Sequence, residues 1–151
     1  MEHDPQYTIE LGDARVRLRP WNHADADALV DAVRDSVDSV GRWLPWCRAD
    51  YGHDAAHAWI ARCQDGWQAG NHFAFAVRSA ADGSLLGGVG LNQFEPIHRR
   101  ANLGYWMRQA CQRRGLATAA AQHVARFGFE QLGLIRIEIV ALPDNAASRA
   151  T

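Results

Sequence analysis

An arginine-rich turn at residues 112–117 constrains this chain more than any other feature of its sequence. The turn reads Gln112-Arg113-Arg114-Gly115-Leu116-Ala117 and follows the apolar run Leu103–Met107. A helical spacing of apolar residues continues from the turn to Phe127. The first amide N–H groups of a helix lack intrahelical partners and lie at the positive end of its dipole. The turn therefore predicts a site for a phosphate or pyrophosphate, with Arg108, Arg113 and Arg114 as additional contacts.

Two better-known phosphate loops do not occur in the sequence. There is no G-x-x-x-x-G-K-[ST] pattern. Gly87, Gly88 and Gly90 do not complete G-x-G-x-x-G, and the polar residues Asn92 and Gln93 follow them where a helix should begin. The turn at residues 112–117 is therefore the phosphate-site candidate that remains.

Length and composition are those of one globular domain with a hydrophobic core. The chain has 151 residues, of which 48% are hydrophobic, and its formal net charge is −1. This charge, without a basic stripe, predicts no nucleic-acid partner, and the lack of a long apolar run predicts no membrane partner. Cys47, Cys63 and Cys111 are odd in number and far apart, and the N-terminus lacks the pattern of a signal peptide. Both features predict reduced thiols and a cytoplasmic location.

Periodicity predicts a strand, two helices, three strands, a helix and a final strand. Asn22 or Asp25 is expected to cap the first helix, Asp82-Gly83 predicts a hairpin turn, and Gly133 is expected to end the last helix. The crossover that encloses the last helix should be right-handed. The predicted strands are 16–19, 73–77, 85–94, 101–107 and 134–142. The first predicted helix contains the apolar positions Leu29, Val30 and Val33, the second runs at about 54–68, and the third begins at 116.

The turn resembles the Q/R-x-x-G-x-G/A loop of the GNAT superfamily of acyl-CoA-dependent N-acetyltransferases. Four further segments resemble the ribosomal-protein N-terminal acetyltransferase branch (RimJ/RimL-like) of that superfamily, in the family order. They are Arg17–Trp21 for its first strand, Trp43–Trp46 for W-L-P-W, Gly104–Trp106 for G-Y-W and Asn145–Ser148 for N-x-x-S. The resemblance covers almost the whole chain.

The resemblance implies an α+β, three-layer fold in a single domain, residues 1–151. Its central sheet should be mixed and mostly antiparallel, with helices on both faces. A bulge should splay strand 101–107 from strand 134–142, with the pantetheine arm in the gap. Family members continue beyond N-x-x-S with two more strands that pair with strand 134–142. We therefore expect that the C-terminal strands are missing, or that a second copy forms a homodimer over this otherwise exposed edge.

The resemblance also implies acetyl-CoA as the cofactor and no metal. Backbone N–H groups from Arg113 to Ala117 are expected to contact the pyrophosphate, and Gln112 to bind a phosphate oxygen or fix the turn. Ser148 would protonate the departing thiolate, and Asp144 or Asn145 could instead cap a helix that begins near Ala146. The full set expected to bind the cofactor is Met107, Gln112, Arg113, Arg114, Gly115, Leu116, Ala117, Thr118 and Asn145.

Two catalytic groups follow from the same resemblance. The backbone N–H of Met107 is the expected donor to the thioester oxygen. Relatives often carry a glutamate as general base where this chain has Asn102, which could orient a water or the substrate instead. The other base candidates are Glu95, His98 and His72. An α-amine can also arrive neutral, because it titrates near neutral pH.

The acceptor implied by the branch is a primary amine, such as the N-terminus of a ribosomal or other protein. Trp43, Trp46 and Tyr105, with Trp106, are candidates to line the substrate cleft. Core packing is expected for at least two of these four, and Trp43 and Trp46, in a loop beside a proline, are the favoured substrate-side pair. A small-molecule amine is a second acceptor class.

Two other functions fit parts of the sequence. A non-catalytic acyl-CoA sensor fits the missing glutamate. A metal-dependent hydrolase is suggested by His53 and His57, which lie four apart on a predicted helix, but the glutamate of H-E-x-x-H and a third ligand are missing.

Overall fold

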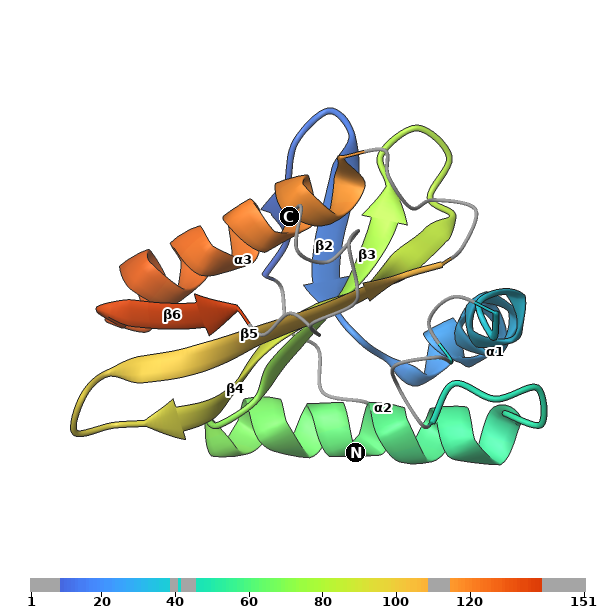
Figure 1. Cartoon of the computed structure of the whole chain (residues 1–151), viewed down its shortest axis with the longest axis horizontal. Coiled ribbons are helices and arrows are strands. Elements are labelled where there is room, and N and C mark those ends of the chain that lie inside the picture. The colour runs from blue at the N-terminus through green and yellow to red at the C-terminus, as the bar shows by residue number, and fades with distance from the viewer. Residues whose placement is uncertain (1–8, 39–40, 42–45, 109–114, 140–151) are drawn as a thin grey trace.

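A six-stranded sheet with helices on both faces forms the framework of the protein (Figure 1). The computed structural model describes residues 9–38, 41, 46–108 and 115–139. In these residues the strands are β1 Leu11–Gly12, β2 Val16–Pro20, β3 Phe73–Ser79, β4 Leu85–Glu95, β5 Arg100–Met107 and β6 Arg136–Ile139. The helices are η1 His23–Asp25 (a 3₁₀ turn), α1 Ala26–Asp35, α2 His53–Ala69 and α3 Leu116–Gln131.

The strands lie in the sheet in the order in which they occur in the chain. Each pairs antiparallel with the next, except that β5 and β6 pair in parallel. Parallel neighbours need a crossover connection, and α3 provides it. The helix therefore begins beyond the C-terminal end of β5 and runs back across the sheet before β6 starts (Figure 1).

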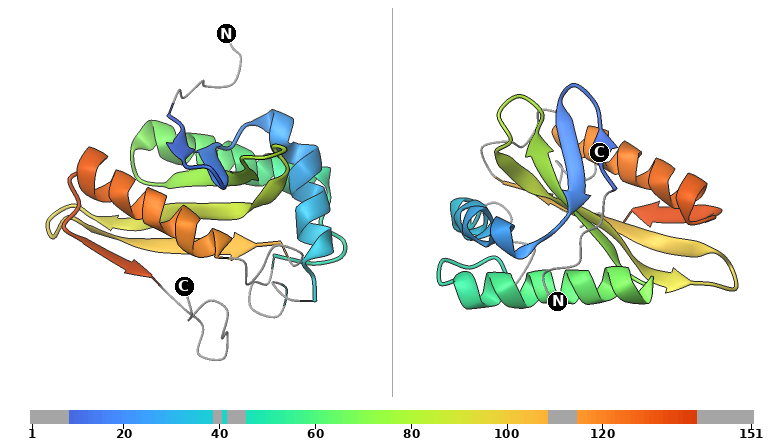
Figure 2. Two further views of the ribbon diagram at one scale, coloured as in Figure 1. Left: turned by 90° about the horizontal axis from the view of Figure 1, so that it is seen from above. Right: turned by 180° about the vertical axis from the view of Figure 1, so that it is seen from behind.

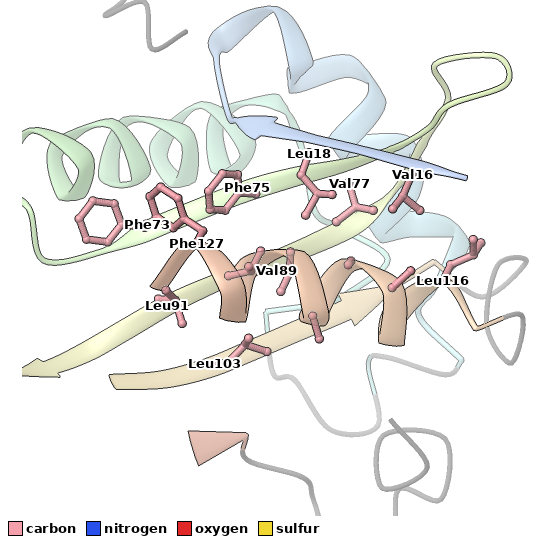
Figure 3. Packing of buried hydrophobic residues seen from close by; sticks show 14 of the residues in the cluster. Val16, Leu18, Phe73, Phe75, Val77, Val89, Leu91, Leu103, Leu116 and Phe127 are labelled. Carbon is pink, nitrogen blue, oxygen red and sulfur yellow. The ribbon is translucent and has the colours of Figure 1, made fainter. Parts of the chain in front are cut away.

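The face of the sheet under α3 holds the larger hydrophobic core. Alternate residues of β2, β3, β4 and β5 point to this face, as the period of a strand requires. Phe127 of α3 lies over the sheet, with its ring centroid 5.4 Å from Phe75 and 5.9 Å from Phe73 (Figure 3). Gly128 lets the helix approach closely, because a Cβ atom there would lie 2.9 Å from Cδ1 of Ile137. This packing fixes the position of α3 on the sheet.

The opposite face is covered by α1 and α2 (Figure 2). Its sheet residues Ala74 and Ala76 are small, so the helices lie close to the strands. Trp21, Leu29, Ile60 and Cys63 fill the space between them and are nearly or fully buried.

A buried carboxylate fixes the start of α1 on this second face. Asp25 is 1% exposed and forms ion pairs with Arg19, at 2.8 Å between Oδ1 and Nη2, and with Arg78. Its Oδ2 also accepts the backbone N–H of Asn22 at 3.0 Å, and Asn22 in turn caps η1. Burial alone would raise the pKa of Asp25, but the hydrogen bonds from Arg19 and Asn22 and the charge of Arg78 outweigh burial and lower it.

The predicted element order is confirmed, and the differences lie at the ends of elements. The helix predicted at 54–68 extends one residue further at each end, and Asn22 and Asp25 both act at the first helix start. β1 was not predicted, because two residues carry no periodic signal. Of the strand predicted at 134–142, the structure describes residues 134–139, and β6 is the last strand of the described sheet; Ile139 of β6 is 47% exposed, and Ile135, which precedes β6, is 63% exposed. Among the described helices, none is both long and apolar enough to cross a bilayer.

We expect Asp25→Ala to lower the free energy of unfolding by about 3 kcal/mol, because the partly buried arginines Arg19 and Arg78 would lose the carboxylate with which they pair. The stabilisation by Asp25 should be complete above the unfolded-state pKa of about 4 and be lost as the pH falls through the lower native pKa. Urea unfolding followed by tryptophan fluorescence between pH 3 and pH 7 measures both effects. Asp27→Ala, which removes an exposed carboxylate of α1, is the control and should change stability by less than about 0.5 kcal/mol. Equal losses for the two variants would contradict the role of Asp25.

Candidate active site

The candidate site lies where β5 ends and α3 begins. Gly115 is the N-cap of α3 and has φ = +75°, a left-handed conformation that favours glycine. It is exposed and offers no side chain to cap the helix, and the first turn of α3 contains no acidic residue. Among the residues that the structure describes, no side chain accepts a hydrogen bond from the first amide N–H groups of the helix, and the helix dipole favours an anion there.

The first residues of α3 divide between the core and the surface. Leu116 is 7% exposed and packs in the core under the helix (Figure 3). Ala117 and Thr118 are half-buried. Leu116 therefore anchors the start of the helix while Gly115 stays at the surface. The predicted site residues Trp43, Gln112, Arg113, Arg114, Asn145 and Ser148 lie outside the described residues.

The backbone of β5 directs the amide of Met107 away from β4. The N–H of Arg108 donates to the carbonyl of Leu86 at 2.8 Å, and successive N–H groups of a strand point to opposite sides. The amides of Met107 and Tyr105 therefore point to the side on which β6 lies. The described pairing with β6 ends at Leu103↔Ile139, so this part of β5 extends beyond described β6.

The pairing of β4 with β5 beside Met107 is close and regular. A Cβ atom at Gly87 would lie 2.1 Å from the carbonyl oxygen of Trp106, so the approach of the two strands requires glycine. The register runs unbroken from Gly87↔Met107 to Asn92↔Asn102, and the shift follows between Asn92 and Glu95. The expected bulge concerns the other side of β5, where it would splay β5 from β6; the described β5–β6 pairing runs from Arg100↔Arg136 to Leu103↔Ile139, so the bulge beside Met107 stays a prediction.

Met107 and Asn102 do not come together. They lie five residues apart on β5, about 17 Å along an extended strand, and their side chains point to opposite faces. Asn102 Nδ2 donates to Oε1 of Gln93 at 2.6 Å. Only one of the two residues can therefore touch a single reacting acetyl group.

The three other base candidates also lie far from Met107. Glu95 is at the opposite end of the β4–β5 pair, where it accepts a hydrogen bond from His98 at 2.9 Å and pairs with Arg100. The hydrogen bond from His98, followed by that from Arg100, lowers the pKa of Glu95 and makes it a weaker base. His72 precedes β3 at the same end of the sheet, and burial lowers its pKa. No base candidate named from the sequence thus lies next to the amide of Met107.

The aromatic residues divide between the two faces of the sheet. Trp46 packs edge-on against Trp106, with ring centroids 5.7 Å apart, and remains 40% exposed. Tyr51 lies behind Trp46 at 6.3 Å, and burial raises the pKa of Tyr51 to about 12. Tyr105 packs against the core under α3, on the other face. The structure therefore joins Trp46 to Trp106 but separates Tyr105 from them.

Two arginines differ from the sequence-based expectation. Arg108 was expected at the phosphate turn, but its Nε lies 3.2 Å from Oδ2 of Asp35, and its Nη1 donates to the carbonyl of Leu85 at 3.2 Å. It ties the end of β5 to the end of α1. Arg15 was not singled out, yet its Nη1 lies 3.5 Å from the position of a Cβ atom at Gly115. No sequence pattern connects two residues that are 100 positions apart.

The two helical histidines have other partners. Nδ1 of His57 lies 2.7 Å from Nδ1 of His23, and Nε2 of His53 lies 2.6 Å from Oδ1 of Asp27. In the described ranges, no group of three or more His, Cys, Asp or Glu side chains is arranged to hold a metal ion.

Comparison with known proteins gives one consistent family. The acetyltransferase (GNAT) domain family matches residues 15–151. The chain is 28% identical over 151 residues to the "Putative ribosomal N-acetyltransferase YdaF" of Bacillus subtilis, covering 95% of this chain and 78% of that protein.

Solved structures with this fold include a "putative ribosomal-protein-serine acetyltransferase" of Vibrio cholerae. It superposes with a TM-score of 0.84 at 29% identity, covering 95% of this chain and 79% of the other. RimL, a ribosomal L7/L12 α-N-protein acetyltransferase in complex with coenzyme A, superposes with a TM-score of 0.83 at 20% identity, over 93% and 80% of the two chains. The latter similarity concerns the fold alone.

We expect Gly115→Leu to weaken binding of coenzyme A by at least about 100-fold, because the side chain would block approach to several helix amides. Gly133→Leu is a matched control, since Gly133 also has a left-handed φ, of +70°, but lies beyond the other end of α3 with open space around it. Both variants should lose similar stability through backbone strain. Calorimetric titration of both with coenzyme A tests the site, and equal affinities would reject it.

Proposed function

Because the chain belongs to the GNAT acetyltransferase domain family, we propose that it transfers the acetyl group of acetyl-CoA to the α-amine of a protein N-terminus. The observation that carries this proposal is the exposed start of α3, whose N-cap residue Gly115 has no side chain to cap it, beyond the end of the strand that holds Met107.

The start of α3 fits the diphosphate of coenzyme A. A diphosphate needs several hydrogen-bond donors close together, and the first turn of a helix presents them as backbone amides. The glycine keeps side-chain atoms away from the approach, and the lack of an acidic residue in the first turn avoids repulsion. The amides at Gly115–Thr118 would hold the phosphates, with Gln112, Arg113 and Arg114 as further contacts.

The acetyl group would lie along the side of β5 that faces away from β4. Attack of an amine places negative charge on the carbonyl oxygen, and a fixed backbone N–H can stabilise that charge. The amides of Met107 and Tyr105 point to this side, and Met107 is nearer to the phosphate turn. We assign the amide of Met107 as the donor to the carbonyl oxygen.

The acceptor amine would approach from the face that carries Trp46 and Trp106. The half-exposed edge of Trp46 offers an apolar wall for a peptide main chain or a small first side chain. An α-amine has a pKa near 7.7 to 8.0, so about a tenth or more is neutral at pH 7 without a base. A lysine amine, with a pKa near 10.4, would need a base. The remoteness of Glu95, His72 and Asn102 from Met107 therefore favours an α-amine acceptor.

The transfer forms a carbon–nitrogen bond as the carbon–sulfur bond breaks. The nitrogen loses one proton and the departing sulfur gains one, so the chain must help a proton to reach the sulfur. Ser148 is the proposed donor, and Asn145 the proposed contact of the pantetheine arm. The names of YdaF and of the Vibrio cholerae protein point to ribosomal proteins as the class of acceptor.

Peptides distinguish the proposed acceptor from other amines. We expect release of free coenzyme A thiol when acetyl-CoA is mixed with a peptide whose α-amine is free and which contains no lysine. A peptide of the same sequence with a blocked N-terminus and one added lysine should give less than about a tenth of that rate, because its amine is almost fully protonated. Faster transfer to the lysine peptide, or to polyamines and amino acids alone, would contradict the α-amine assignment.

Ser148→Ala should lower kcat about tenfold or more and leave the Kd for acetyl-CoA nearly unchanged, since a proton donor to the leaving group acts only in the transition state. Ser148→Cys retains a proton donor and should recover part of the rate. Steady-state kinetics together with calorimetric titration measures both quantities. A larger effect on Kd than on kcat would remove the proposed role of Ser148.

A further inference from the structure

A tight turn between β1 and β2 lies against α3 and carries Arg15. The N–H of Asp13 donates to the carbonyl of Val16 at 2.9 Å. Oδ1 of Asp13 accepts the backbone N–H of Arg15 at 2.7 Å and that of Val16 at 3.1 Å. These bonds define the backbone path of the turn.

The turn is also tied to its neighbours. Oδ2 of Asp13 lies 2.8 Å from Nε2 of His123, in the middle of α3. The carbonyl of Arg15 accepts the N–H of Ala80, in the connection between β3 and β4, at 3.0 Å. The hydrogen bond from His123, with that from the Arg15 backbone, lowers the pKa of Asp13 to about 2. The carboxylate of Asp13 is therefore ionised at neutral pH when it contacts His123 of α3. The backbone of Arg15 is therefore fixed relative to α3.

The guanidinium of Arg15 reaches the start of α3. Its Nη1 lies 3.5 Å from the point where a side chain on Gly115 would begin. The carboxylate of Asp13 is engaged with His123 and the main chain. Within the described ranges, the guanidinium forms no ion pair or hydrogen bond. A positive, forked donor thus lies beside the helix amides that the proposed function assigns to a diphosphate.

From this placement we propose that Arg15 binds the diphosphate of coenzyme A, beside the amides of α3. The inference rests on the proposed function, and it adds a specificity residue from the N-terminal hairpin to a site otherwise built from the start of α3. An arginine suits this position, because its planar fork can donate two parallel hydrogen bonds to phosphate oxygens. The Asp13–His123 tie positions the hairpin so that Arg15 can do so.

The test compares three ligands on four proteins. Coenzyme A, 3′-dephospho-coenzyme A and pantetheine are titrated by calorimetry into the wild-type chain, Arg15→Gln, Arg15→Lys and Arg17→Gln. Arg17 is a matched control because it is exposed, carries the same charge and lies two residues away on β2. Thermal unfolding checks that each variant is folded.

We expect Arg15→Gln to raise the Kd about tenfold or more for both nucleotide ligands and to leave pantetheine binding unchanged, because pantetheine lacks the diphosphate. Arg15→Lys should lose less, since it keeps the charge but not the fork. The dependence of log Kd on log salt concentration should be less steep for Arg15→Gln than for Arg17→Gln.

Three results would overturn the inference. Equal Kd values for Arg15→Gln and Arg17→Gln would show no specific contact. A loss for coenzyme A without a loss for its dephospho form would place Arg15 at the 3′-phosphate instead. An equal loss for pantetheine would indicate a general structural effect. If the wild-type chain bound no coenzyme A, the proposed function would fail together with the inference, whereas normal wild-type binding with an unaffected Arg15→Gln would reject the inference alone.

Discussion

The packing of Phe127 against Phe73 and Phe75 of β3 determines the position of α3 on the sheet, and the position of α3 determines where its N-terminus lies. Phe73 and Phe75 receive Phe127, and Trp67 packs in the same cluster, with its ring centroid 4.8 Å from Phe73, 5.3 Å from Phe75 and 6.0 Å from Phe127. Gly128 allows the helix to sit close to β6. With both features in place, the backbone amides at Gly115 are fixed beyond the end of β5. A rigid helix end needs no rearrangement to bind an anion, which favours a preformed site.

The same arrangement brings distant parts of the chain to one end of the sheet. Arg15 comes from the first hairpin and Gly115 from the start of α3, while Arg108 connects β5 to Asp35 at the end of α1. Asp25 secures the other end of α1 through two arginines. The ion pairs of Arg108 and Asp25 thus hold α1 to the sheet. They connect the end of the sheet that carries the proposed phosphate contacts to the face that carries Trp46 and Trp106, where the amine is proposed to approach.

Periodicity and turn residues were enough to predict the main elements, because each has a strong local signal. The alternation in β2, the Asp82-Gly83 turn and the helical spacing after Gly115 are examples. The contacts between elements had no such signal. The register of β5 places Trp106 on the face of Trp46 and Tyr105 on the face of α3. A shift of the register by one residue would exchange the faces of these two side chains. The diversion of Arg108 to Asp35 and the approach of Arg15 to Gly115 likewise depend on tertiary packing.

A crystal structure of this chain grown with coenzyme A tests the central claim most directly. The account predicts that the diphosphate oxygens lie within about 3 Å of the backbone nitrogens at Gly115–Thr118, with the pantetheine arm along the β5 side that faces away from β4. A bound nucleotide located elsewhere on the surface, with the start of α3 free of phosphate, would contradict the account.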